Sequence, residues 1–175
     1  MARNNAFTVF IVDDDSKFTT MCQHYMDKNS VYNLDIHAFA TGEDCLAKMD
    51  ELKPEVVVLD YYFDAVDEGA KNGMAVLDEI KAKHPTTHVV MISAQDNMET
   101  AIETVRRGAT DYIIKSDTAI MFTQLTTDKI LREKAAALAF RNYRRGVKVL
   151  IIVMSLFILG LVGFLVAVTV FRLKI

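Results

Sequence analysis

The sequence predicts an α/β fold in which a five-stranded parallel sheet is covered by helices on both faces. Short apolar runs alternate along the chain with segments of helical periodicity, and the central run, residues 56–59, is apolar without alternation. Each parallel connection needs a crossover, and crossovers are right-handed. We therefore expect a doubly wound sheet whose reactive edge lies beyond the carboxyl ends of the strands.

The elements follow one another as five strand–helix units. The first strand is predicted over residues 7–12, and the apolar residues after it recur at helical spacing as far as Tyr25. Residues 32–39 alternate apolar and polar side chains, as a half-buried strand does, and Thr41 can cap the next helix. Further strands, each followed by a helical pattern, are expected at residues 56–59, 89–92 and 112–114.

Composition limits the classes of function. The chain has 175 residues and a net charge of −3, and its first 146 residues hold 17 basic and 23 acidic residues, a net charge of −6. An acidic domain argues against nucleic-acid binding, because phosphate neutralisation needs clustered Lys and Arg. Cys22 and Cys45 show neither metal-ligand spacing nor a disulfide pattern, so we expect reduced thiols in the core.

The C-terminal segment, residues 149–171, carries no charge and predicts a transmembrane helix. Its residues would reach about 35 Å as a helix, and a hydrocarbon core is about 30 Å thick. Gly163 and Ala167 form a small-residue pair that would allow a homodimer in the membrane. More positive charge precedes the span than follows it, with Arg141, Arg144, Arg145 and Lys148 against Arg172 and Lys174.

By the positive-inside rule, this asymmetry predicts a single-pass protein of the inner or plasma membrane with its main domain in the cytoplasm. The predicted parts are a globular domain over residues 1–130, a helical juxtamembrane linker over 131–146, the transmembrane helix over 147–171 and a short tail over 172–175.

Polar side chains follow four of the predicted strands at the same edge of the sheet. Clustered carboxylates repel one another unless a cation binds them, and oxygen ligands favour Mg²⁺. Mg²⁺ beside carboxylates, an amine and a hydroxyl suits phosphoryl transfer, in which one Asp accepts the group as an acyl phosphate. These residues are Asp13, Asp14 and Asp15 after the first strand, Asp60 after the third, Ser93 after the fourth and Lys115 after the fifth.

With these residues the sequence resembles the receiver domain of two-component response regulators, over residues 7 to about 130. The resemblance implies a CheY-like, flavodoxin-like fold of strand order 2-1-3-4-5. Four segments carry the resemblance: Val-Phe-Ile-Val-Asp-Asp-Asp at 9–15, Val-Val-Val-Leu-Asp at 56–60, Val-Val-Met-Ile-Ser-Ala at 89–94 and Gly-Ala-Thr-Asp-Tyr-Ile-Ile-Lys at 108–115.

The resemblance also implies a role for each acid at the predicted site. Asp60 would be the phosphoacceptor, and Asp13 and Asp14 would hold Mg²⁺ together with it. The backbone carbonyl of Tyr62 would be a further metal ligand. Asp15 is expected to be a solvated loop acid or a helix cap.

The hydroxyl and the amine complete the predicted machinery. By the same resemblance Ser93 and Lys115 join Asp60 as catalytic residues that contact the phosphoryl oxygens. Ser93 and Tyr112 would form a switch pair that remodels the surface of the fourth helix, the fifth strand and the fifth helix. A half-buried strand aromatic is the structural alternative for Tyr112.

These observations predict a membrane-anchored response regulator that is phosphorylated by a histidine kinase or a histidine phosphotransfer protein. It would signal by protein contact, without nucleic acid, an organic cofactor or an enzymatic activity beyond its own phosphorylation and dephosphorylation. The alternatives are a phosphate sink and a pseudo-receiver that is never phosphorylated.

A haloacid-dehalogenase-like phosphatase would use Asp13 and Asp15, but Lys17 stands where that family expects Thr or Val. The loop between Asp60 and Gly73 is several residues longer than usual in receivers. We expect a solvated insertion there, with kinase selection or gating of hydrolysis as the alternative.

Overall fold

The computed structural model describes residues 6–63, 72–94 and 96–172. Within the last helix, the side chains of residues 142, 145, 161, 162 and 164–172 are outside this description. The chain consists of two compact units, Met1–Arg132 and Glu133–Ile175. The long loop predicted between Asp60 and Gly73 lies largely outside the described residues.

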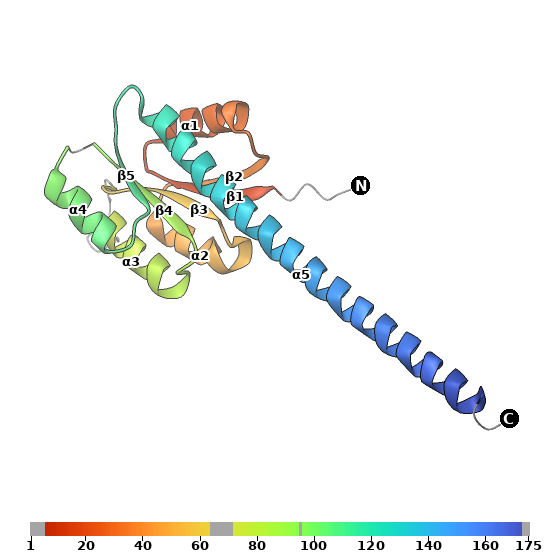
Figure 1. The fold of residues 1–175 in the computed structure, drawn as a ribbon. Helices are drawn as coiled ribbons and strands as arrows, with labels where there is room; N and C mark the ends of the chain where they lie inside the picture. Colours follow the sequence, from red (N-terminus) through yellow and green to blue (C-terminus); the bar gives the residue numbers. More distant parts are fainter. Residues whose placement is uncertain (1–5, 64–71, 95, 173–175) are drawn as a thin grey trace. The chain divides into compact units, whose positions relative to one another are not determined.

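The first unit is built on a parallel sheet of order β2-β1-β3-β4-β5, as predicted (Figure 1). The observed strands begin and end within two residues of the predicted ones. Apolar and β-branched residues form these strands because their side chains pack well on a pleated, buried surface. The strands are β1 (Phe7–Val12), β2 (Leu34–Phe39), β3 (Val56–Asp60), β4 (His88–Ser93) and β5 (Asp111–Ile114).

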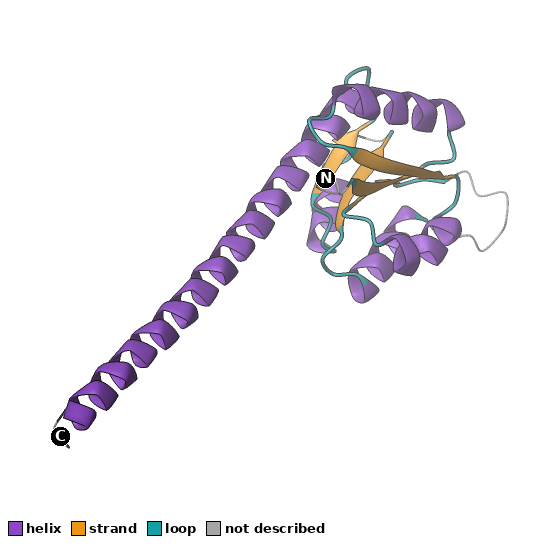
Figure 2. Cartoon of the chain, turned by 90° about the vertical axis from the view of Figure 1, so that its right-hand side faces the viewer, coloured by secondary structure: helices purple, strands orange, loops and turns teal. Residues whose placement is uncertain are grey.

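Helices connect successive strands and cover both faces of the sheet (Figure 2). Four of them begin after a residue whose side chain caps the free backbone amides of the first turn, namely Asp15, Thr41, Asn72 and Asn97. The helices are α1 (Ser16–Asn29), α2 (Gly42–Leu52), α3 (Gly73–Lys83), α4 (Met98–Arg106) and α5 (Ala119–Arg172).

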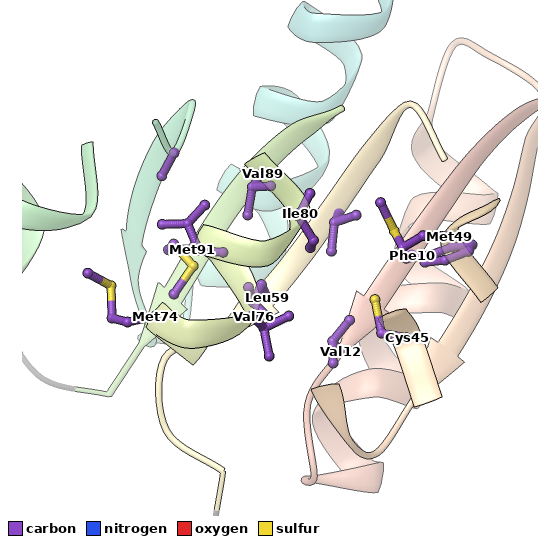
Figure 3. Packing of buried hydrophobic residues seen from close by; sticks show 13 residues of the cluster. Phe10, Val12, Cys45, Met49, Leu59, Met74, Val76, Ile80, Val89 and Met91 are labelled. Carbon is purple, nitrogen blue, oxygen red and sulfur yellow. The ribbon is translucent and has the colours of Figure 1, made fainter. Parts of the chain in front are cut away.

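Two hydrophobic clusters hold the layers together, one on each face of the sheet. Alternation along β1 sends Phe10 and Val12 to the face covered by α2 and α3, and Val9 and Ile11 to the face covered by α1 and α5. Figure 3 shows the first cluster, in which Phe10, Val12, Leu59, Val89 and Met91 of the strands meet Cys45, Met49, Met74, Val76 and Ile80 of the helices. The second cluster includes Cys22, Met26, Ile130 and Leu131.

Cys22 and Cys45 are therefore free, buried thiols in opposite clusters, as predicted. Burial raises the pKa of each thiol to about 12. A thiolate is disfavoured in an apolar core, so both cysteines act as packing residues.

The C-terminal part of the predicted fold needs correction. α5 is one helix from Ala119 to Arg172, and where its side chains are described no stretch is both long and apolar enough to span a bilayer. The transmembrane helix over 147–171 and the single-pass membrane localisation are therefore wrong on the described residues.

The rest of that predicted span, residues 161, 162 and 164–171, falls outside the described side chains, and so does Ala167 of the small-residue pair. The membrane-based homodimer thus has no support, because it required the transmembrane helix. The other predicted boundaries, at residues 130 and 146, stay predictions.

Candidate functional site

Two buried carboxylates lie at the carboxyl end of the sheet, one from each of two neighbouring strands. Asp13 follows β1 and is 2% exposed, and Asp60 ends β3 and is 5% exposed. Asp14 lies beside them and is exposed. The three residues can offer carboxylate oxygens that all lie within 4.8 Å of one another. The prediction that these acids converge is confirmed.

Lys115 joins the two buried acids. Its Nζ atom lies 2.8 Å from Oδ2 of Asp13 and 2.8 Å from Oδ2 of Asp60. The backbone amide of Lys115 donates to the carbonyl oxygen of Ser93 at 2.7 Å, which continues the β4–β5 pairing to the point where the lysine side chain begins. The ammonium therefore neutralises part of the charge that the two carboxylates bring together.

Local hydrogen bonds set the position of Asp13. Its amide donates to the carbonyl of Phe39 on β2 at 3.0 Å, and its Oδ1 atom accepts from the amide of Asp15 at 2.9 Å. The carboxylate of Asp15 in turn accepts from the amides of Lys17 and Phe18, at 2.8 and 3.3 Å. Asp15 is thus the cap of α1, one of the two predicted readings of this residue.

Asp60 is held from the other side. The amide of Tyr61 donates to the carbonyl of Ile92 at 2.8 Å, and the amide of Gly73 donates to the carbonyl of Tyr61 at 3.1 Å. A Cβ atom on Gly73 would overlap the carbonyl oxygen of Asp60, so only glycine allows α3 to start this close to the end of β3.

Residues 9–126 match the family model of the response regulator receiver domain. The chain belongs to the response regulator receiver family. Membership places it in two-component signalling, in which receiver domains are phosphorylated on an aspartate. The comparisons give no support to the phosphate sink or the pseudo-receiver, nor to an anchor in the membrane.

Curated relatives agree with this assignment. The receiver is 33% identical over 110 residues to the chemotaxis protein CheY of Listeria monocytogenes serovar 1/2a, an alignment that covers 61% of this chain and 84% of that protein. It is 31% identical over 134 residues to the nitrogen assimilation regulatory protein NtrX of Azorhizobium caulinodans. That alignment covers 73% of this chain but only 28% of NtrX.

Solved structures share the fold. The receiver domain of NtrX from Brucella abortus is 30% identical, with a TM-score of 0.61, and the match covers 71% of this chain and 98% of that domain. The BeF3-activated receiver domain of DrrB has a TM-score of 0.62 at 23% identity, over 73% of this chain and 99% of that one, which shows a common fold.

Burial dominates the electrostatics of the receiver site. It raises the pKa of Asp60 to about 6. The hydrogen bond from Lys115 and the backbone amide of Tyr62 oppose this increase, whereas the negative charge of Asp13 adds to it. Burial also raises the pKa of Asp13, against the hydrogen bonds from Lys115 and Asp15. For Lys115 burial acts to lower the pKa, but its hydrogen bonds to the two acids outweigh it and the pKa lies above its usual value.

The donor set fits a divalent cation. Three carboxylates and one ammonium leave a net charge of −2, and every ligand atom that the three acids offer to a metal is an oxygen. Oxygen-only ligation with this charge suits Mg²⁺. Receiver domains in general bind Mg²⁺ at such an acidic cluster, so the prediction of a cation site agrees with both the family and the geometry. The carbonyl of Tyr62 as a further ligand stays a prediction.

Ser93 and Tyr112, the predicted switch pair, lie on neighbouring strands. Ser93 is fully buried at the end of β4, and Tyr112 is partly buried on β5 against the cluster under α2 and α3. Tyr112 also lines a surface pocket with Ile114 and Phe122. This partial burial agrees with both predicted readings of Tyr112, and the switch role stays a prediction.

Two residues at the site have roles that sequence reasoning missed. Gly73 was taken only as the end of a long loop, although it makes the closest approach to the backbone of Asp60. Phe18 is one of the apolar residues predicted at helical spacing after the first strand; it packs against the core cluster, and its ring centroid also lies 5.1 Å from Nζ of Lys115. The available signal was weak: Phe18 stands one turn into the helix that follows the acids.

Proposed function

We propose that Asp60 accepts the phosphoryl group, from a histidine kinase or a histidine phosphotransfer protein, and that the receiver then signals by protein contact. The observation that carries this proposal is the position of the Asp60 carboxylate. It ends the central strand, contacts a lysine ammonium at 2.8 Å and lies within 4.8 Å of two further carboxylates.

In the proposed reaction an oxygen of Asp60 attacks the phosphorus atom, and the bond from phosphorus to the donor nitrogen breaks. The leaving imidazole takes up a proton from solvent. Asp13, Asp14 and Asp60 would hold Mg²⁺ through their carboxylate oxygens, and the bound ion would neutralise charge on the phosphoryl oxygens.

Lys115 has two successive tasks in this scheme. Before transfer its ammonium partly neutralises the two buried acids. After transfer the Asp60 oxygen that bonds phosphorus is no longer a full anion, so the ammonium turns to a phosphoryl oxygen, beside the hydroxyl of Ser93. Ser93 and Tyr112 then act as the proposed switch pair, and catalysis by the chain is limited to its own phosphorylation and dephosphorylation.

The test is phosphorylation of the full chain by acetyl phosphate with Mg²⁺, followed by intact mass and peptide mapping. We expect one hydroxylamine-labile phosphoryl group on Asp60 that is absent from Asp60→Asn and lost when EDTA replaces Mg²⁺. Asp27→Asn, which makes the same chemical change at an exposed position on α1, is the matched control. Persistence of the label in Asp60→Asn would overturn the assignment.

A further inference from the structure

Phe18 lies where α1 begins, next to the acidic end of the sheet. Its side chain is partly buried and packs against the cluster under α1 and α5. The ring centroid is 5.1 Å from Nζ of Lys115, which is within the range of a cation–π contact. The ammonium therefore has an aromatic ring as a neighbour in addition to Asp13 and Asp60.

The ring is fixed relative to the acids by a short chain of hydrogen bonds. Asp13 accepts from the amide of Asp15, and the carboxylate of Asp15 accepts from the amide of Phe18. The next amide, that of Thr19, donates to the carbonyl of Asp15 at 3.0 Å. Five residues after Asp13, Phe18 is thus tied to the same backbone that positions the first carboxylate.

We propose that Phe18 is a positioning residue that holds the ammonium of Lys115 at the phosphorylation site. This inference rests on the proposed function of Asp60. A lysine side chain has four flexible carbons, and because the Lys115 side chain is 23% exposed, its ammonium can also turn toward water. The electron-rich face of the ring attracts the ammonium and does not change charge when Asp60 does.

This difference matters during transfer. Phosphorylation converts the Asp60 carboxylate into an acyl phosphate, so Lys115 loses one of its two carboxylate partners and keeps Asp13. The ring keeps its attraction through that change, so it keeps the ammonium close enough to contact a phosphoryl oxygen. A cation–π contact at a partly exposed site corresponds to about a two- to fivefold effect on an equilibrium or a rate.

The contact itself is tested by a double-mutant cycle that needs no phosphorylation. Phe18→Leu keeps an apolar side chain but removes the ring, and Lys115→Met removes the charge. We expect Phe18→Leu to lower the folding equilibrium constant, the ratio of folded to unfolded full chain, about two- to fivefold more in the wild-type background than in Lys115→Met. Equal effects in both backgrounds would overturn the proposal.

Phe7→Leu is the matched control for that cycle. Phe7 is another partly buried phenylalanine of the same cluster, and its ring centroid lies 5.4 Å from that of Tyr32. We expect its effect to be the same in both backgrounds, because among the described residues the ring of Phe7 makes no cation–π contact with Lys115. Coupling of Phe7 as large as that of Phe18 would show a general packing response and would count against the proposal.

The positioning role is tested by the rate of phosphorylation with acetyl phosphate and saturating Mg²⁺. We expect Phe18→Leu to be about two- to fivefold slower, Phe18→Tyr to be close to wild type, and the slowing to vanish in a Lys115→Met background. Coupling in the stability cycle with no change in this rate would refute positioning. If the wild type took no phosphate on Asp60, the proposed function would fail while the stability cycle still reported the contact.

Discussion

Replacing Asp60 by asparagine should make the metal-free receiver more stable at neutral pH. In the folded chain the pKa of Asp60 is raised to about 6, mainly by burial, from an ordinary value of 3.8. A pKa difference of one corresponds to about 1.4 kcal/mol, so ionised Asp60 costs the folded state roughly 3 kcal/mol relative to its protonated form. Asparagine removes this cost but also weakens the contact with Lys115, and we expect a net gain of about 1–3 kcal/mol.

The sign of the pH dependence follows from the same pKa. Between pH 3.8 and about 6 the folded chain binds a proton at Asp60 that the unfolded chain has already released. The contribution of this group to stability is therefore fully present below pH 3.8 and is lost as the pH rises to about 6. The difference in free energy of unfolding between Asp60→Asn and the wild type should therefore grow between pH 3.8 and about 6 and stay constant at higher pH.

Urea denaturation of the full chain in EDTA, at a series of pH values, measures both effects. Asp27→Asn serves as the surface control and should change the free energy of unfolding by less than about 0.5 kcal/mol. Added Mg²⁺ should narrow the difference in free energy of unfolding between the two chains. The wild type offers the ion three carboxylates and the variant only two, so the ion stabilises the wild type more. An Asp60→Asn chain that is less stable than wild type at neutral pH would refute the reasoning, since the ion pair would then outweigh burial.

Three further changes test other parts of the site and core. Lys115→Met leaves two buried carboxylates without their cation, so it should destabilise the metal-free chain by about 1–3 kcal/mol, a loss that Mg²⁺ partly restores in the same urea titration. Gly73→Ala should lower the free energy of unfolding by more than about 2 kcal/mol and slow phosphorylation, because the new Cβ atom would overlap the backbone of Asp60 and Tyr61. Gly146→Ala is the control: its Cβ atom would meet open space within a helix, so the change should be neutral or stabilise the chain by up to about 1 kcal/mol. Cys22 and Cys45 are buried thiols with a pKa of about 12, so at pH 8 they should react with a disulfide reagent only as fast as the chain opens. Denaturant should abolish this protection. Rapid labelling of the folded chain would contradict their burial.

Much of the site could be predicted from the sequence because parallel strands bring their carboxyl ends to one edge. Once the apolar runs were assigned to strands, the residue after each run had to lie at that edge. Asp13, Asp60 and Lys115 converge there for this reason. The cap at Asp15 could be predicted in the same way, since an acid before a helical pattern commonly accepts from the first free amides.

The C-terminal segment shows where local pattern was insufficient. Hydropathy over residues 149–171 predicted a membrane span, and the described part of α5 does not provide one. An uncharged run indicates that a helix tolerates an apolar environment, but it does not by itself say what covers that helix.

The sequence by itself determined the order of the elements, the two apolar faces of the sheet and the edge at which the acids gather, because periodicity and chain direction decide these. Only the tertiary structure decided that one ammonium contacts both Asp13 and Asp60, that the ring of Phe18 lies beside it and that Gly73 meets the backbone of Asp60. These contacts join segments far apart in the chain, and their distances depend on how helices pack on the sheet, which no local pattern encodes.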